Sequence, residues 1–451
     1  MPKKTATPQT KKHPGPIEPE RKHKGGKHHP HPPKGGTPTP PPPNPPLPPP
    51  VTSGQPIFGQ PKPSPDPTSF SQPVTDQGIA QENQLEPLPA SGPDPAVTAE
   101  PVLTLAQVYG DAGPAKEASI TAAGQIIFHS VGDTGSVTGP QTQSLVADKM
   151  VTDFDEANPA DAPSFFYHLG DVVYYFGEAT YYYDQFYDPY RDYPAPILAI
   201  PGNHDGVVYA SDPAKSLDAF LANFCASAPI HSPDAGGLSR TTMIQPAVYF
   251  TLEAPFVRIL GLYSNVLEDP GVISAQTGTA IPNTILDSRQ VDFLTAALRR
   301  VKTENYTGAV IIAVHHPPFT GGTDHGGSPL MLADIDAACS AAGVWPHAVF
   351  SGHAHNYQRY TRTVNGMQIP FIVAGGGGHN PLSAMRTTLR TPYPIDSTLT
   401  LNSYDATDYG YLRVVVNATT LTVEYHPQSD GGTTKTPNDV VTLDLATRTV
   451  S

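Results

Sequence analysis

Six residues of the types that bind metal ions follow apolar runs in the second two-thirds of the chain. In chain order they are Asp133, Asp171, Asn203, His315, His353 and His355. This mixture of carboxylate, amide and imidazole side chains is larger than one ion needs. It suits two ions a few ångströms apart, which can stabilise both the attacking and the leaving oxygen of a phosphoryl displacement. The residue types therefore predict a binuclear hydrolytic site.

The segments around these residues predict an α/β fold. Apolar, β-rich runs end just before the candidate ligands, at residues 126–131, 164–169, 196–200, 310–314 and 348–350. Apolar residues at a spacing of three or four predict helices at 217–224, 291–301 and 331–342, and Ser288 is expected to cap the second. Because open α/β sheets bind ligands at the carboxyl ends of their strands, the strands can bring distant residues together. Alternating runs at 411–416, 421–425 and 440–445 predict antiparallel strands at a sheet edge.

The N-terminal hundred residues have a different composition from the rest. Roughly half of the 54 prolines lie there, and residues 1–35 carry nine Lys or Arg against two Glu, about +7. With −14 for the whole chain, the remainder is about −21 (−14 minus 7). We expect residues 1–100 to be a disordered arm with polyproline II character, followed by one domain at 101–451. The arm is interpreted as a solvated cationic linker that could contact acidic polymers or surfaces, and its histidines (His23, His28, His29, His31) could bind metal adventitiously.

Several classes of protein are not supported by the sequence. No apolar stretch reaches the ~18 residues of a membrane helix, and no apolar segment follows the N-terminal lysines, so neither a membrane span nor a signal peptide is predicted. The cytoplasm is then the default location. No specific nucleic-acid binding is predicted. Cys225 and Cys339 are the only cysteines, and we interpret them as two thiols, although one disulfide stays open.

Each motif is weak alone, because Gly-Asp at a strand end is usually a turn. As a set they resemble the calcineurin-like metallophosphoesterase superfamily, and most closely its purple acid phosphatase group. The resemblance rests on Gly132-Asp133-Thr134-Gly135, Gly170-Asp171-Val172-Val173-Tyr174, Gly202-Asn203-His204-Asp205 and Gly352-His353-Ala354-His355. The motif at residues 312–315 departs slightly from the pattern of the group. The resemblance covers roughly residues 125–425, about two-thirds of the chain.

The resemblance implies a two-sheet sandwich flanked by helices and a role for each matching residue. Metal 1 would be held by Asp133, Tyr174 and His355, and metal 2 by Asn203, His315 and His353, with Asp171 bridging the two. His204 and Asp171 would be catalytic, and His204, His325 and Asn203 would contact substrate. His204 would donate to the phosphate and the leaving oxygen. His315 is preferred over the adjacent His316 as the ligand.

Tyr174 decides the metal pair. If it is a ligand, the resemblance implies Fe(III) with a divalent Fe, Zn or Mn ion, because a phenolate suits a hard trivalent ion. Tyr174 also belongs to a local group of tyrosines at positions 174, 175, 181, 182, 183 and 187, so core packing remains an alternative. His325 lies in the glycine-rich stretch 321–327, which we interpret as a mobile surface loop, so simple exposure is the alternative to a substrate role.

Three functions remain open. The first is an acid phosphatase-like enzyme that cleaves phosphomonoesters by attack of a metal-bound hydroxide. The second uses the same chemistry on phosphodiesters such as nucleotides or lipid headgroups. The third is a non-catalytic metal-binding scaffold. The family resemblance also suggests an extracytoplasmic location, against the default given above.

Overall fold

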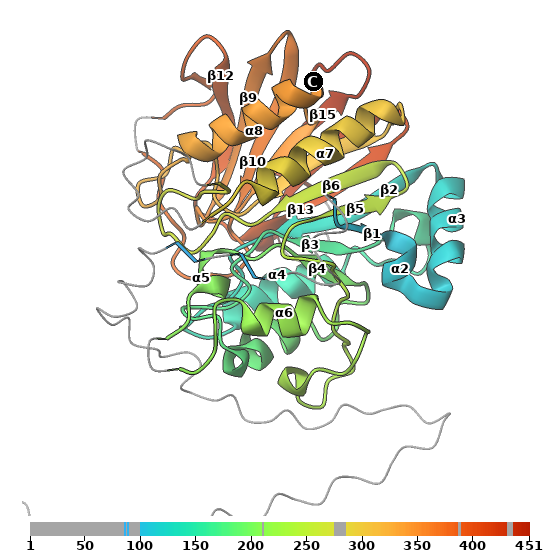
Figure 1. Cartoon of the computed structure of the whole chain (residues 1–451), viewed down its shortest axis with the longest axis vertical. Coiled ribbons are helices and arrows are strands. Elements are labelled where there is room, and N and C mark those ends of the chain that lie inside the picture. The colour runs from blue at the N-terminus through green and yellow to red at the C-terminus, as the bar shows by residue number, and fades with distance from the viewer. Residues whose placement is uncertain are drawn as a thin grey trace, which may run out of the picture. The chain divides into compact units, whose positions relative to one another are not determined.

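The computed structural model describes residues 85–86, 88–89, 100–209, 212–274, 286–386, 389–430 and 436–451. Most of the predicted arm, including its four histidines, lies outside the described residues, so the prediction of disorder stays a prediction. The described residues form a mixed α/β fold in which two sheets are flanked by helices (Figure 1). The predicted fold class is thereby confirmed.

The first sheet contains, among the described residues, nine strands in the order β1-β5-β6-β7-β8-β10-β9-β12-β11. Their bounds are β1 (Val102–Thr104), β5 (Phe250–Ala254), β6 (Val257–Leu262), β7 (Ala309–Val314), β8 (Ala348–Ser351), β9 (Tyr357–Val364), β10 (Met367–Ala374), β11 (Tyr393–Pro394) and β12 (Leu399–Asp405). The central strands β6, β7, β8 and β10 run parallel. Consequently the carboxyl ends of β6, β7 and β8 lie on the same side of the sheet. The predicted ligands His315 and His353 follow β7 and β8 there.

The second sheet has the order β15-β14-β13-β2-β3-β4 in the described part of the chain. Its strands are β2 (Gln125–Val131), β3 (Phe166–His168), β4 (Ile197–Ala199), β13 (Gly410–Asn417), β14 (Thr420–Pro427) and β15 (Asp439–Asp444). The strands β2, β3 and β4 are parallel, whereas β13, β14 and β15 are antiparallel. The antiparallel C-terminal strands expected from the sequence are confirmed. They extend the sheet that contains β2 and β3, the strands that precede the first two ligand motifs.

The strands at the centre of the sandwich are buried on both faces. In β7, Ile311 belongs to the core shared with Phe128 and Leu198 of the second sheet, and its neighbour Ile312 belongs to the core on the opposite face. This difference follows from the pleat, which points successive side chains to opposite faces. Strands buried on both faces have continuous apolar sequences, and every residue of β7 is apolar. The rings of Tyr357 and Tyr425 stack with centroids 4.1 Å apart and join the two sheets.

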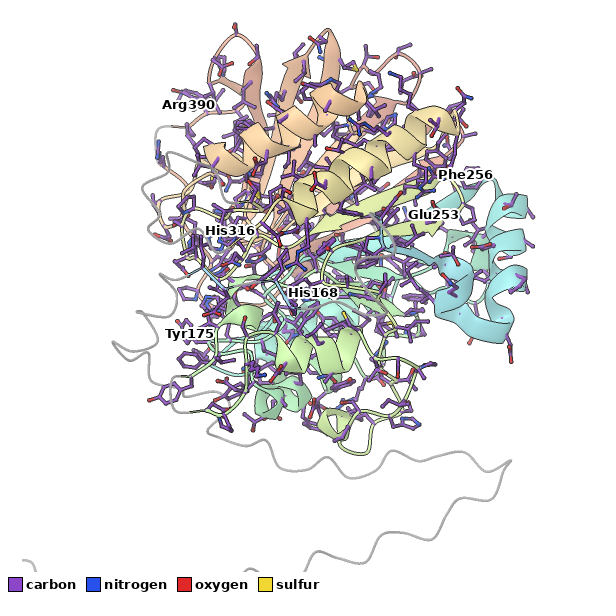
Figure 2. The ribbon with its side chains drawn as sticks, viewed as in Figure 1. His168, Tyr175, Glu253, Phe256, His316 and Arg390 are labelled. Atoms are coloured by element: carbon purple, nitrogen blue, oxygen red, sulfur yellow. The ribbon has the colours of Figure 1, made fainter. Side chains whose placement is uncertain are left out.

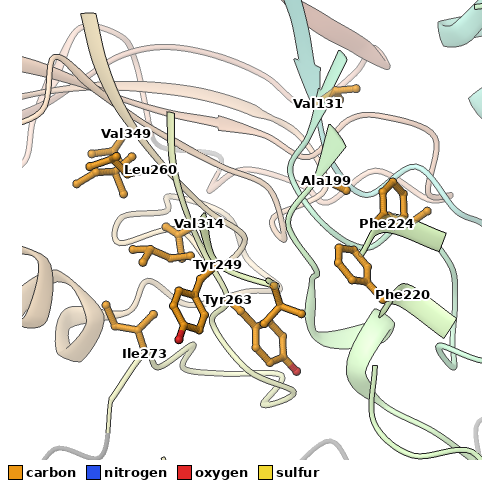
Figure 3. Packing of buried hydrophobic residues seen from close by; sticks show 14 of the residues in the cluster. Val131, Ala199, Phe220, Phe224, Tyr249, Leu260, Tyr263, Ile273, Val314 and Val349 are labelled. Carbon is orange, nitrogen blue, oxygen red and sulfur yellow. The ribbon is translucent and has the colours of Figure 1, made fainter. Parts of the chain in front are cut away.

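Helices cover the outer faces of both sheets. Two of them, α7 (Arg289–Thr303) and α8 (Pro329–Ala342), lie side by side over the first sheet (Figure 1). The other α-helices in the described part are α2 (Leu105–Tyr109), α3 (Gly113–Ala123), α4 (Gln141–Val151), α5 (Asn203–Gly206) and α6 (Asp218–Phe224). Figure 3 shows Phe220 and Phe224 of α6 near Ala199 of β4 in the core outside the second sheet. Ser288 occupies the N-cap position of α7 as expected, but its hydroxyl donates to the Asp292 carboxylate (2.7 Å) and caps no backbone N–H group.

Part of the predicted arm packs against the body. Leu85 and Leu88 are each 7% exposed and belong to the core that includes Val266. The side-chain amide of Asn265 accepts from the Glu86 N–H (3.0 Å) and donates to the Glu86 carbonyl (2.7 Å). This paired contact imitates one rung of a β-ladder. These described residues, which lie inside the segment predicted to be an arm, therefore contact the body.

Two smaller predictions can be compared with the structure. Both cysteines are described, and both are free thiols, Cys225 half-buried and Cys339 buried. The disulfide left open by the sequence therefore does not form. Among the described helices, none has the length and apolar character needed to cross a membrane.

Candidate metal centre

The predicted ligands lie in loops that directly follow parallel strands of both sheets. Asp133 follows β2 and Asp171 follows β3 in the second sheet, and His353 follows β8 in the first. These three residues have φ angles of 57°, 54° and 64°. Left-handed backbone is uncommon for residues other than glycine, and such strain gathers at functional sites. It accompanies the sharp turns that follow β2, β3 and β8.

The first group of predicted ligands is Asp133, Tyr174 and His355. The hydroxyl of Tyr174 donates to Oδ1 of Asp133 (3.1 Å) and lies 3.2 Å from Nε2 of His355. That Nε2 atom is 3.5 Å from the same Oδ1. Three potential ligand atoms therefore face one another, and Tyr174 and Asp133 are completely buried.

The second group lies beside the first and contains Asn203, His315, His353 and Asp171. The Nε2 atom of His315 is 3.1 Å from Oδ1 of Asn203 and 3.2 Å from Oδ2 of Asp171. Ligand atoms of Asp171, His315 and His353 all lie within 4.8 Å of one another. Because His315 is also 3.9 Å from Asp133, the two groups are continuous. The structure thus brings all seven predicted ligands together.

The residues present fit metal ions. Within the described part of the chain, the buried Nε2 atom of His353 makes no hydrogen bond. Burying such a group without a partner is costly, and coordination would remove the cost. The loops also approach so closely that a Cβ atom on Gly352 would lie 2.5 Å from Oδ2 of Asp133. Only glycine fits there.

The electrostatics of the centre give a second reason to expect metal ions there. Burial and the nearby Asp171 carboxylate raise the pKa of Asp133 well above its ordinary value, although His315 opposes this. Burial alone would lower the pKa of His315, but Asp171 and Asp133 outweigh it and raise that pKa to about 9. Two buried carboxylates held this close need positive charge between them. Bound cations would supply this charge and leave the imidazoles neutral, as ligands must be.

Hydrogen bonds outside the two groups fix the orientation of the ligands. The Nδ1–H group of His315 donates to the carbonyl of Leu169 (2.8 Å), which turns Nε2 toward the centre. The Asp205 carboxylate accepts from the N–H groups of Val172 and Gly202 and so ties the second and third motifs together. Such outer contacts set the tautomer and angle of metal ligands.

Neighbouring histidines are occupied in other ways. His316 uses both ring nitrogens, Nδ1 with the Ser264 hydroxyl (2.7 Å) and Nε2 with the Leu267 carbonyl (2.7 Å). His168 likewise contacts the Thr134 hydroxyl through Nε2 and the Gly170 N–H group through Nδ1. Both residues are labelled in Figure 2. The partners of both rings are outside the predicted ligand set, whereas Nε2 of His315 faces the predicted ligands Asn203 and Asp171, in line with the preference for His315.

The predicted substrate residues line the same centre. His204 donates from Nδ1 to the Tyr175 carbonyl (2.9 Å), and its ring lies 4.4 Å from that of Tyr174. The ring of His325 is 4.3 Å from that of His353, and its side chain is only 11% exposed. The glycine-rich loop therefore holds His325 against the predicted ligands, whereas the sequence also allowed simple exposure.

Two further residues at the centre were not assigned a role from the sequence. The buried ring of His379 lies 4.0 Å from Tyr174 and 4.3 Å from His355. The sequence feature that could have indicated His379 is the run of four glycines directly before it, at residues 375–378. Glu268 reaches the centre from the loop after β6, and its carboxylate accepts from Nδ2 of Asn203 (3.0 Å). The sequence indicated Glu268 less clearly, because it lies six positions after Leu262, the last residue of that strand.

Comparison with known proteins agrees with this geometry. Residues 131–357, about half of the chain, match the family described as calcineurin-like phosphoesterase. The chain belongs to this family. It is therefore a metal-dependent phosphoesterase, and the resemblance recognised in its motifs is confirmed. Residues 370–435 match a second family, described as iron/zinc purple acid phosphatase-like protein C. A comparison with curated proteins gave no significant match.

Solved structures with a similar fold include three that differ in their described roles. GAP50, the anchor in the inner membrane complex of Plasmodium, is 12% identical, with 71% of this chain and 89% of that chain covered and a TM-score of 0.45. PhoD is 12% identical, with 73% and 71% covered and a TM-score of 0.43. A dimetal phosphatase from Danio rerio is 12% identical, with 71% and 99% covered and a TM-score of 0.39. All three TM-scores lie below 0.5, so no conclusion about activity rests on them.

Proposed function

We propose that the protein is a binuclear phosphomonoesterase of the acid phosphatase type. The observation that supports it most directly is the meeting of two ligand groups at Asp171. Asp133, Tyr174 and His355 would hold one ion, and Asn203, His315 and His353 the other, with Asp171 between them. Bound there, two cations would supply an activated water molecule and neutralise the phosphate oxygens. The phenol of Tyr174 favours Fe(III) in the first position and a divalent Fe, Zn or Mn ion in the second.

His204 and His325 would act on the substrate. Because Nδ1 of His204 is bonded to the Tyr175 carbonyl, its Nε2 atom is the one available to the phosphate and the leaving oxygen. In the imidazolium form that atom could protonate the leaving alkoxide. His325 would contact a phosphate oxygen from the opposite loop, next to His353.

A second candidate is phosphodiester hydrolysis, which needs the same residues. The match of the C-terminal part to a purple acid phosphatase-like family favours the monoesterase. A non-catalytic scaffold is not favoured, because the chain belongs to a family of phosphoesterases.

Paired substrates separate the candidates. With the full chain loaded with Fe(III) and Zn, kcat/KM should be at least about tenfold higher for p-nitrophenyl phosphate than for bis-p-nitrophenyl phosphate, a difference of about 1.4 kcal/mol in transition-state stabilisation. The reverse order would assign the protein to the diesterases. Hydrolysis of neither ester by protein that contains two ions would contradict both proposals.

A further inference from the structure

Glu268 touches three residues of the candidate centre at once. Its Oε2 atom accepts a hydrogen bond from Nδ2 of Asn203 (3.0 Å) and lies 3.8 Å from Nε2 of His204. Its Oε1 atom lies 3.6 Å from Nδ1 of His325. One carboxylate therefore connects a predicted metal ligand with both predicted substrate residues.

The backbone beside Glu268 is held in place. The buried His316 contacts the carbonyl of Leu267 through Nε2 (2.7 Å), and the N–H group of Val272 donates to the carbonyl of Ser264 (2.9 Å). The side chain of Glu268 is 37% exposed, so its position comes from this fixed backbone and from its polar contacts.

The contact with Asn203 decides how that amide is turned. A carboxylate can only accept hydrogen bonds, so it selects the NH₂ end of the amide and turns the carbonyl oxygen the other way. That oxygen, Oδ1, then lies 3.1 Å from Nε2 of His315 inside the centre. Only the oxygen of an amide binds a hard or borderline cation, because its nitrogen has no lone pair to offer. Rotation of the amide by half a turn would remove one ligand from the second ion.

We propose that Glu268 is a positioning residue that keeps the carbonyl oxygen of Asn203 turned toward the second metal ion. The role rests on the proposed function, in which Asn203 is a ligand. Glu268 binds no ion itself in this role, because its Oε2 atom is used by the NH₂ group of Asn203 and its Oε1 atom lies beside Nδ1 of His325. Outer partners of this kind typically change metal affinity by about 10–100-fold.

A general effect of negative charge near the centre is the competing explanation, and variants separate the two. Glu268→Ala removes both the acceptor and the charge, whereas Glu268→Gln removes the charge but keeps an acceptor oxygen of the same reach. Asp324→Asn is the matched charge control, because Asp324 is an exposed carboxylate beside His325 whose hydrogen bond comes from Thr323 (3.1 Å). Glu268→Leu is a second removal variant in case the alanine variant folds poorly.

The experiment is a calorimetric titration of Zn²⁺ into the full chain loaded with one equivalent of Fe(III), with circular dichroism to check folding. Glu268→Ala and Glu268→Leu should bind the added ion at least about tenfold more weakly than wild type. Glu268→Gln should stay within about threefold of wild type, and Asp324→Asn should be unchanged, because both keep the acceptor that turns the amide.

Three outcomes would overturn the role of Glu268. These are unchanged affinity in both removal variants, equal losses in Glu268→Gln and Glu268→Ala, or a similar loss in Asp324→Asn. A wild-type protein that takes up no second ion would instead refute the proposed binuclear function, so the two failures are distinguishable.

Discussion

The phenol oxygen of Tyr174 lies 3.1 Å from Oδ1 of Asp133, a residue 41 positions earlier in the chain. Burial, with the carboxylates of Asp133 and Asp171, raises the pKa of this phenol well above its ordinary value. A phenolate could form at this position only if a cation compensated its charge. The same contact therefore allows a neutral phenol that donates to Asp133 or a phenolate that binds iron beside it.

Replacing Tyr174 separates these states. If Tyr174 binds Fe(III), the wild-type protein should be coloured by charge transfer from phenolate to iron, and Tyr174→Phe should lose that visible absorption while keeping its fold. The matched control is Tyr175→Phe, because Tyr175 contacts His204 through its backbone carbonyl. Absorption spectra of the iron-loaded proteins give the result. A wild-type protein that holds iron but has no such band would remove Tyr174 from the ligand set.

Asp171 is the residue whose loss should affect both ions. Its Oδ2 atom lies 3.2 Å from Nε2 of His315, and its Oδ1 atom accepts from the His204 N–H group (3.0 Å). Asp171→Ala should abolish activity and most metal binding, because one carboxylate would serve both ions. Elemental analysis measures the outcome, and retention of two ions per chain would refute the bridging role.

The packing of residues 85–86 and 88–89 predicts different outcomes for two truncations. Removal of residues 1–84 should keep turnover of p-nitrophenyl phosphate within about twofold, because none of the residues placed at the site lies there. Removal of residues 1–95 should lower stability, because it uncovers the core beneath Leu85 and Leu88 and leaves Asn265 without its backbone partner. Leu88→Ala in the full chain should cost about 2–5 kcal/mol, the usual range for a buried leucine. Urea unfolding tests both, and equal midpoints for the two truncations would contradict the packing.

His347, which is outside the candidate centre, predicts that the folded protein loses stability in acid. Burial and the nearby Arg448 lower the pKa of His347 from 6.5 to about 3, and Nδ1 of its ring accepts from the Val310 N–H group (2.9 Å). Because the unfolded chain binds this proton more readily, the contribution to stability is complete above pH 6.5 and is lost as the pH falls toward 3. In that window the free energy of unfolding should fall by up to about 1.4 kcal/mol per pH unit more in wild type than in His347→Asn. The exposed His231 provides the control substitution, and parallel pH profiles for wild type and His347→Asn would refute the assignment.

The sequence predicted the parts of the fold that repeat a local pattern. Apolar runs followed by Asp133, Asp171 and His315 marked strand ends, and parallel strands carry such ends to one edge. In the second sheet, the strands β3 and β4 are shorter than predicted. Residues 164–169 were expected as a strand, yet β3 spans Phe166–His168, because Leu169 and Gly170 already belong to the turn that places Asp171.

What the sequence could not predict depends on contacts between distant segments. Nothing near Leu85 indicates that this segment packs against a loop about 180 residues later, because the contact depends on the burial of Leu85 and Leu88 and on one distant amide, Asn265. Glu268 was missed for a related reason: it lies in an irregular loop whose course is set by His316, itself 48 residues away. His379 follows a readable glycine run, but its approach to Tyr174 depends on how the two sheets pack.

The role of His204 can be tested through the leaving group. Its Nδ1 atom is bonded to the Tyr175 carbonyl, so Nε2 would face the ester oxygen, and the loss of this ring should not disturb the ligand groups. If Nε2 protonates the leaving oxygen, His204→Ala should keep both ions and lose roughly 10²–10⁴-fold in kcat, the usual contribution of a positioned general acid. The loss should shrink for esters of acidic phenols such as p-nitrophenol, which leave without protonation. The slope of log kcat against the pKa of the leaving alcohol should therefore become steeper in the variant. An equal loss for every ester, with an unchanged slope, would instead mean that His204 stabilises phosphate oxygens and transfers no proton.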